Sequence, residues 1–135
     1  LSLIAQRELG TMTRMQFFVL AATVPGVFSL VMLFAPGLML KNALAEPAHA
    51  TALTVTRWAG FAVFSIACIT FLSRNDPGSE ALRAVMAGNV VFHLMGIAVD
   101  GHGFASGAMT RSGLITGLVP HAALAAGFLY FLSTM

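Results

Sequence analysis

The sequence predicts an all-α integral membrane protein folded as a four-helix transmembrane bundle. The first reason is composition: 58% of the 135 residues are hydrophobic and only 9% are charged, whereas a soluble domain needs about a quarter charged residues to keep its surface hydrated. The second is that four apolar segments each approach the length of about 20 residues that a helix needs to cross the hydrocarbon core. A chain of this length is expected to form one domain, residues 1–135.

Polar segments divide the chain into predicted spans at residues 15–40, 50–72, 82–99 and 112–132. The separators carry turn signals: Glu46–Pro47 in the first, the run 75–78 (Asn-Asp-Pro-Gly) in the second, and Asp100–Gly101 opening the third. Ser79 is expected to cap the third helix. Residues 1–13 alternate apolar and charged side chains, which predicts either a short interfacial helix or a frayed end.

Lysine and arginine are unevenly divided between the two ends of the predicted bundle. Arg7, Arg14, Arg74 and Arg83 fall on the side of the N-terminus, and Lys41 and Arg111 on the opposite side. Because cytoplasmic loops carry the excess of Lys and Arg, both termini are expected in the cytoplasm.

Several classes of protein are excluded by the remaining charges and by cysteine. The net charge is only +2 and the basic residues are scattered singly, so a nucleic-acid surface is not expected. Cys68 is the only cysteine, which rules out an intrachain disulfide and a cysteine-based zinc site. We expect Cys68 to be a small buried hydrophobe.

Three ionisable side chains, Arg57, His93 and His121, stand inside the apolar spans. Burying such groups in hydrocarbon is costly, so they usually face the protein interior and act there. At about 1.5 Å per residue, each lies roughly 10 to 13 Å from the outer end of its predicted span. The sequence therefore predicts one polar layer in the outer half of the membrane.

Helical phase groups further residues with these three. Asn89, His93, Gly96 and Asp100 share one face of the third span, because spacings of three and four residues keep one side of a helix. Arg57 shares a face of the second span with Phe61 and Phe64, and His121 shares a face of the fourth with Gly113 and Gly117. Pro120 frees the carbonyl of Thr116 beside His121, which favours a pocket there.

Simpler interpretations stay open for these residues. Arg57 can reach the headgroups along its long stem, and the two histidines can be satisfied by each other, by Asn89 or by a backbone carbonyl. No third histidine or carboxylate stands at the same depth, so a non-haem metal site is not predicted.

The polar layer suggests a binding pocket for a small hydrophobic ligand, either quinone-like or a lipid. Arg57, Asn89, His93 and His121 would bind its head, and three aromatic residues would pack its body: Phe61, Phe64 and Phe92. The chain has no catalytic motif, so the main hypothesis is a non-enzymatic binding protein or accessory subunit of a larger membrane complex. The alternative is an electron-transfer protein in which His93 and His121 hold haem b.

Short motifs resemble the DoxX-like family of small bacterial membrane proteins. They are the first span ending in LFAPGLML (residues 33–40), the Arg57-Trp58-Ala59-Gly60 opening of the second, and Asp100–Gly101 after the third. The resemblance implies a four-helix bundle in the bacterial inner membrane. For some members, it also implies association with quinone-linked redox enzymes as a small subunit.

Overall fold

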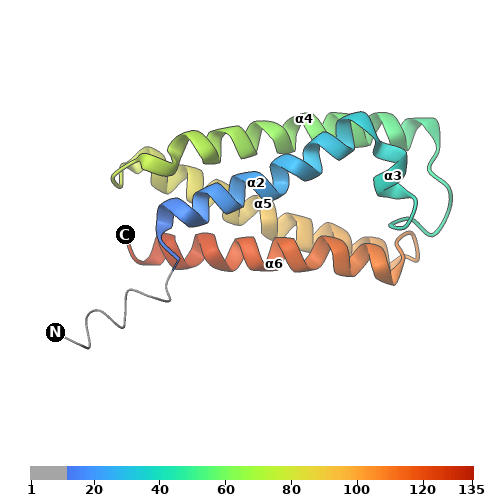
Figure 1. Cartoon of the computed structure of the whole chain (residues 1–135). Helices are drawn as coiled ribbons and strands as arrows, with labels where there is room; N and C mark the ends of the chain where they lie inside the picture. Colours follow the sequence, from blue (N-terminus) through green and yellow to red (C-terminus); the bar gives the residue numbers. More distant parts are fainter. Residues whose placement is uncertain (1–11) are drawn as a thin grey trace.

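The computed structural model describes residues 12–135, so the predicted interfacial helix at residues 1–13 lies outside the described residues except at its end. Within residues 12–135, four helices are long and apolar enough to cross a membrane, which confirms the predicted fold class. They are α2 (Arg14–Phe34), α4 (Ala50–Leu72), α5 (Glu80–Ala105) and α6 (Arg111–Ser133), and two short helices, α3 (Pro36–Leu40) and η1 (Ser73–Asn75), connect them (Figure 1).

Hydroxyl side chains begin three of the four long helices. Thr13 forms a capping box with Gln16 at the start of α2. Ser79 accepts a hydrogen bond from the amide of Leu82, so its predicted role as N-cap of α5 is confirmed. Thr110 caps α6 in the same way. Each cap satisfies a backbone donor that the first helical turn leaves free.

The first helix is shorter than predicted. It ends at Phe34, and the remaining residues form α3, which turns across the end of the bundle (Figure 1). Pro36 causes the break: Ala35 before it takes φ −137° and ψ 51°, because a residue preceding proline is pushed out of the α conformation. Residues 35–40 therefore do not continue the span that the sequence predicts at 15–40.

The third helix is longer than predicted. It continues through Asp100–Gly101, where the sequence predicts a loop, and ends only at Ala105. Neither Gly101 nor Gly103 takes a positive φ; Gly107 does so, at 78°, just beyond the helix, and such a glycine is a common helix stop. His93 therefore lies about 18 Å from the end of α5 at about 1.5 Å per residue, nearer the middle of the helix than expected.

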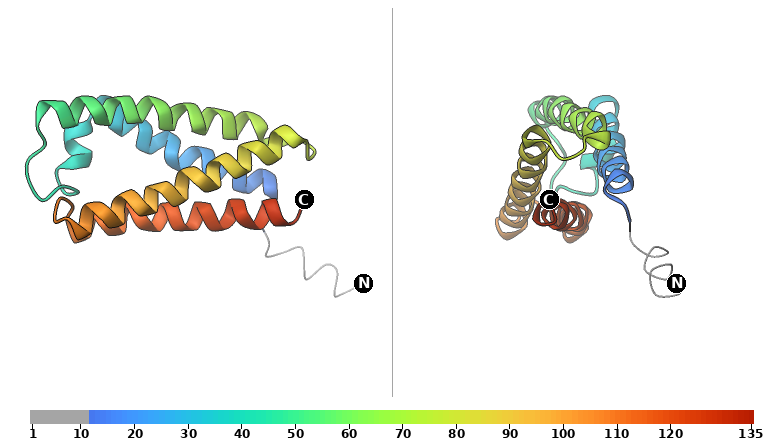
Figure 2. Two further views of the ribbon diagram at one scale, coloured as in Figure 1. Left: turned by 180° about the vertical axis from the view of Figure 1, so that it is seen from behind. Right: turned by 90° about the vertical axis from the view of Figure 1, so that its left-hand side faces the viewer.

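The long helices form two close pairs, α2 with α4 and α5 with α6 (Figure 2). Gly60 marks the crossing of the first pair: a Cβ atom there would lie 3.0 Å from Met32 and 3.2 Å from the carbonyl oxygen of Ser29. A small residue at this point lets the two helix backbones approach.

At the end that holds the C-terminus, the two pairs meet through aromatic packing. The ring of Phe128 on α6 lies 4.9 Å from that of Phe17 and 5.7 Å from that of Phe18, both on α2. Phe18, Phe128 and Met86 are fully buried. This cluster is the core of the molecule, and it fixes α2 against α6 only at this end.

At the opposite end, α3 and the segment after it bridge the two pairs. The amide of Thr110 donates to the carbonyl of Ala43 at 2.9 Å, and the amide of Ala45 donates to Ala108 at 3.1 Å. The hydroxyl of Thr110 also donates to the carbonyl of Asn42. These bonds tie the α3 side of the bundle to the α5–α6 connection and close the end of the space between the pairs.

Candidate functional site

A cavity of about 290 Å³ lies between the two helix pairs, in the half of the bundle nearer α3. Its polar lining comes from His93 and Asp100 on α5 and from Thr116 and His121 on α6. The rest of the wall is largely apolar: Val24, Pro25, Phe28, Met32, Met39, Leu40, Ala43, Leu44, Val63, Phe92, Met109, Gly113, Gly117, Pro120 and Leu124. A few polar groups converging in an apolar hollow are typical of small-molecule sites.

The two histidines contact each other directly. Their Nδ1 atoms lie 2.9 Å apart, a hydrogen bond between α5 and α6. One Nδ1 must donate and the other must accept, so in a neutral pair one ring carries its proton on Nδ1 and the other on Nε2. In the neutral pair the two Nε2 atoms therefore differ: one is an acceptor and the other a donor.

Glycines make room for the polar side chains on both helices. A Cβ atom at Gly96 of α5 would lie 2.5 Å from Nε2 of His121, and one at Gly117 of α6 would collide with Oδ2 of Asp100. Each glycine stands four residues before a polar residue on its own helix, Asp100 after Gly96 and His121 after Gly117. The antiparallel pair thus presents a polar side chain from each helix to a glycine of the other.

Two buried side-chain polar atoms of the cavity residues have no partner within residues 12–135. They are Nε2 of His93, whose side chain is only 2% exposed, and Oδ2 of Asp100. Leaving a buried polar atom unpaired costs about 1 to 3 kcal/mol. A ligand or water that bonds to either atom would recover that free energy.

Both intrahelical prolines line the same cavity. Pro25 stands inside α2 and Pro120 inside α6. Each lacks an amide hydrogen and so breaks one bond of the helical ladder. In α6 this frees the carbonyl of Thr116, itself a lining residue, as the sequence indicates. Pro120 therefore adds a backbone acceptor at a residue of the cavity wall.

Asn89 lies on the same stripe of α5 as His93 but contacts a different helix. Its amide donates to the hydroxyl of Thr70 on α4 at 3.2 Å and to the carbonyl of Val85 at 2.9 Å. Thr70 and Asn89 are both buried. Asn89 joins the two helix pairs and is not among the residues that line the cavity.

The aromatic and cationic residues predicted for the site fall in two places. Phe92 lines the cavity and packs edge-on against both histidine rings, with centroids 5.2 Å from His93 and 6.0 Å from His121. Arg57, Phe61 and Phe64 lie exposed on α4 and do not line the cavity. The structure thus brings together His93, His121 and Phe92, and leaves the α4 residues outside.

Two further residues depart from what the sequence suggests. Cys68 is exposed on α4, so the expectation that it is buried was wrong. Asp100 lines the cavity from within α5, whereas the sequence predicts that Asp100–Gly101 forms a turn. The stripe Asn89–His93–Gly96–Asp100 was the signal for its inward position, once the helix is known to continue.

The residues at the cavity do not fit a haem held between the two histidines. A bis-histidine haem needs room for the iron and its macrocycle between the two rings, whereas the rings of His93 and His121 are in contact here, with centroids 5.2 Å apart and a hydrogen bond of 2.9 Å between their Nδ1 atoms. Among the described residues, no group of three or more His, Cys, Asp or Glu side chains could hold a metal ion.

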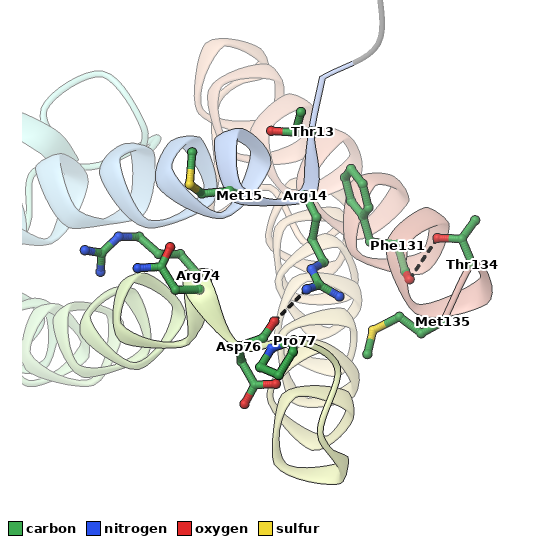
Figure 3. Close-up of a pocket in the computed structure, with 10 residues that line it drawn as sticks. Thr13, Arg14, Met15, Arg74, Asp76, Pro77, Phe131, Thr134 and Met135 are labelled. Carbon is green, nitrogen blue, oxygen red and sulfur yellow. Dashed lines mark hydrogen bonds between the residues drawn. The ribbon is translucent and has the colours of Figure 1, made fainter. Parts of the chain in front are cut away.

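A second hollow, of about 460 Å³, lies at the end of the bundle that holds the C-terminus (Figure 3). Arg14 donates there to the backbone carbonyl of Asp76, while the guanidinium of Arg74 points away from that of Arg14 and stacks on Phe71 at 3.9 Å. Hydrogen bonds from the amides of Ser79 and Gly78 hold the pKa of Asp76 below its usual value. The polar groups here fasten the α4–α5 turn and do not converge on a common point.

Comparison with known proteins gave no match: no family model matches this chain, and neither does a curated protein nor a solved structure.

Proposed function

We propose that this small polytopic membrane protein is a non-enzymatic binding protein for an amphipathic ligand, quinone-like or a lipid. The ligand head would lie beside His93, His121 and Asp100, and its body against the apolar wall that includes Phe92. The observation that carries the proposal is a pair of unpartnered buried polar atoms, Nε2 of His93 and Oδ2 of Asp100, on residues lining an otherwise apolar cavity.

The surrounding packing supports a site over a merely structural contact. Gly96 and Gly117 hold space for His121 and Asp100, so the polar side chains stay between the helices and do not turn outward. A preformed arrangement of this kind lowers the entropy cost of binding.

We propose further that the protein works beside a larger membrane complex in a bacterial inner membrane, with both termini in the cytoplasm. The orientation follows from Arg14, Arg74 and Arg83, which lie near the helix ends on the side of the C-terminus. The accessory role extends the DoxX-like resemblance. It is supported by the broad apolar outer face of α4, where Trp58 and Phe61 are 72% and 59% exposed.

Native mass spectrometry of the protein purified in mild detergent tests the ligand. We expect a bound small molecule at one per chain, identified after extraction, that is lost from His93→Phe and His121→Phe. His102→Phe is the matched control, because His102 is exposed on the same helix as His93. A ligand retained equally by all three variants, or a wild-type protein that carries none, would contradict the proposal.

Co-purification tests the accessory role separately. Larger membrane proteins should accompany the chain in mild detergent and be lost when the outer face of α4 is changed, as in Trp58→Ala with Phe61→Ala. Isolation only as a monomer or homo-oligomer would argue against a partner complex without affecting the ligand site.

A further inference from the structure

We infer that the ligand enters sideways from the bilayer, between α2 and α6, and that it is a single-chain amphiphile with an uncharged head. This inference rests on the proposed function and specifies the route and the chemical class for the same site. Three features carry it: a groove that adjoins the cavity, the divergence of α2 from α6, and the hydrogen-bonding character of the histidine pair.

The groove is a hollow of about 300 Å³ on the side of the molecule where α2 faces α6. Val27, Val31 and Ser112 line only this groove. Five residues line both the groove and the cavity: Phe28, Met39, Ala43, Gly113 and Thr116. Because the two hollows share these residues, they adjoin each other. Val27 is 57% exposed, so the groove faces the surroundings of the bundle.

The packing explains why an opening lies here. Phe17 and Phe128 hold α2 against α6 at the end with the C-terminus, and Gly127 leaves room for the Phe17 ring. Toward α3, α2 leaves α6 and runs with α4 (Figure 1). The short segment 41–44, seated on the start of α6 at Gly113, closes the end of the bundle but not its side. Access is therefore lateral, from the lipid.

The size of the hollows favours one chain. Ligand pockets for drug-sized molecules measure about 300 to 1,000 Å³, and the cavity and the groove, at about 290 and 300 Å³, lie at the lower limit. A head in the cavity and one chain along the groove fill this space. The cavity and the groove together do not have room for the second acyl chain of a phospholipid.

The charge of the lining disfavours an anionic head. Within residues 12–135, no lysine or arginine lines the cavity or the groove, and Asp100 is the single acid. An anionic head would find no permanent cation and would lie beside a carboxyl group. When neutral, the hydrogen-bonded pair His93–His121 has one donor and one acceptor at its Nε2 atoms. An ammonium only donates and a carboxylate only accepts, whereas a hydroxyl does both.

Photolabelling in nanodiscs tests both parts. Three probes share one hexadecyl chain with a diazirine near its middle and differ only in head: an alcohol, a carboxylic acid and an amine. Labelled positions are mapped by mass spectrometry. We expect the alcohol to label groove positions on α2 and α6, such as Val31 and Ser112, and the labelling to disappear in His93→Phe. The acid and the amine should label the groove weakly.

Two variants address the route. Val27→Trp and Ser112→Trp place a large ring in the groove without replacing a residue that lines the cavity, and labelling inside the cavity should be lost in both. Val55→Trp is the control, since Val55 is 60% exposed on α4. Asp100→Asn removes the acid and should raise labelling by the carboxylic acid probe relative to wild type.

The outcomes separate the inference from the proposed function. No probe labelling at cavity or groove positions above that on the outer face of α4 would overturn the single-chain amphiphile, whereas a wild-type protein that carries no co-purified ligand would overturn the proposed function itself. Cavity labelling that persists in Val27→Trp and Ser112→Trp would overturn the lateral route alone. Labelling by the acid or the amine as strong as by the alcohol would overturn the uncharged head alone.

Discussion

At the scale of single residues, the α5–α6 contact depends on glycines as much as on the polar groups they face. Gly96 lies under the ring of His121, and Gly117 lies under the carboxyl of Asp100. Neither glycine is needed for a positive φ, since both lie inside regular helix. Because glycine has no Cβ atom, the polar side chains fit between two closely packed helices in an apolar environment.

Replacing either glycine by alanine should therefore damage the site. Gly96→Ala must displace the His121 ring, and overpacking of this kind costs about 1 to 3 kcal/mol. We expect a lower unfolding free energy in detergent titration and loss of the co-purified ligand. Gly88→Ala is the matched control on α5, because nothing lies within 4 Å of a Cβ atom there; equal effects at Gly88 and Gly96 would contradict the close contact.

Asn89 belongs to the same stripe but has a structural role. Asn89→Ala removes the buried bonds to Thr70, and interhelical hydrogen bonds in membranes contribute about 0.6 to 2 kcal/mol. We expect that loss in the unfolding free energy, measured by circular dichroism during denaturant titration, with ligand content unchanged. If Asn89→Ala keeps its stability but loses the ligand, the structural role is wrong and Asn89 binds the ligand, as the sequence suggests.

At the scale of helices and turns, the sequence predicts local features such as helix caps, but it does not predict which helices pack against each other. The residues around Ser79 predict an N-cap, and the structure confirms it. The stripe on α5 was also correct as a face, yet it contacts two helices, with Asn89 meeting Thr70 of α4 and His93 meeting His121 of α6. Periodicity defines a face but not the order of helices around a bundle.

Turn signals in the sequence did not place the ends of α2 and α5 correctly, because the ends also depend on neighbouring residues and on the apolar surroundings. Pro36 broke the first span because proline acts on its immediate neighbour. Asp100–Gly101 did not end α5, because a continuing helix satisfies its own backbone bonds in an apolar setting. Arg57 was grouped with the histidines because its depth along the helix matches theirs. Depth is predictable from sequence, whereas the direction of a side chain depends on packing, and Arg57 lies exposed on α4.

The turn between α4 and α5 should confer acid sensitivity. The folded pKa of Asp76 lies below its unfolded value because the amides of Ser79 and Gly78 bond its carboxylate. The stabilisation is then present above the unfolded pKa of about 3.9 and is lost as pH falls through the folded value. Asp76→Asn should be less stable than wild type at pH 7, and the difference should shrink toward pH 3. A difference independent of pH would contradict this.

At the scale of the whole molecule, two helix pairs meet tightly at one end and are bridged at the other by α3 and the segment after it. The aromatic cluster around Phe128 provides rigidity, and the bridged end contains the cavity. Arg14, Arg74 and Arg83 lie near the tight end, which is the proposed cytoplasmic side, so the cavity lies in the other half of the bundle.

This orientation predicts the labelling of introduced cysteines in intact cells. In a Cys68→Ser background, Ser106→Cys should react with a membrane-impermeant maleimide, and Asn75→Cys should react only after permeabilisation. The two positions lie in the turns at opposite ends of α5. The reverse pattern would invert the proposed topology and leave the fold unchanged.

The most direct test of the central claim uses the four histidines of the chain. His93 and His121 line the cavity, while His49 and His102 are exposed and serve as internal references. In protein labelled with ¹⁵N-histidine, titration with the hexadecyl alcohol should shift the ring nitrogens of His93 and His121 and saturate at one ligand per chain. Ring signals that all move alike, or cavity signals that do not move while the reference signals do, would contradict a ligand site at this histidine pair.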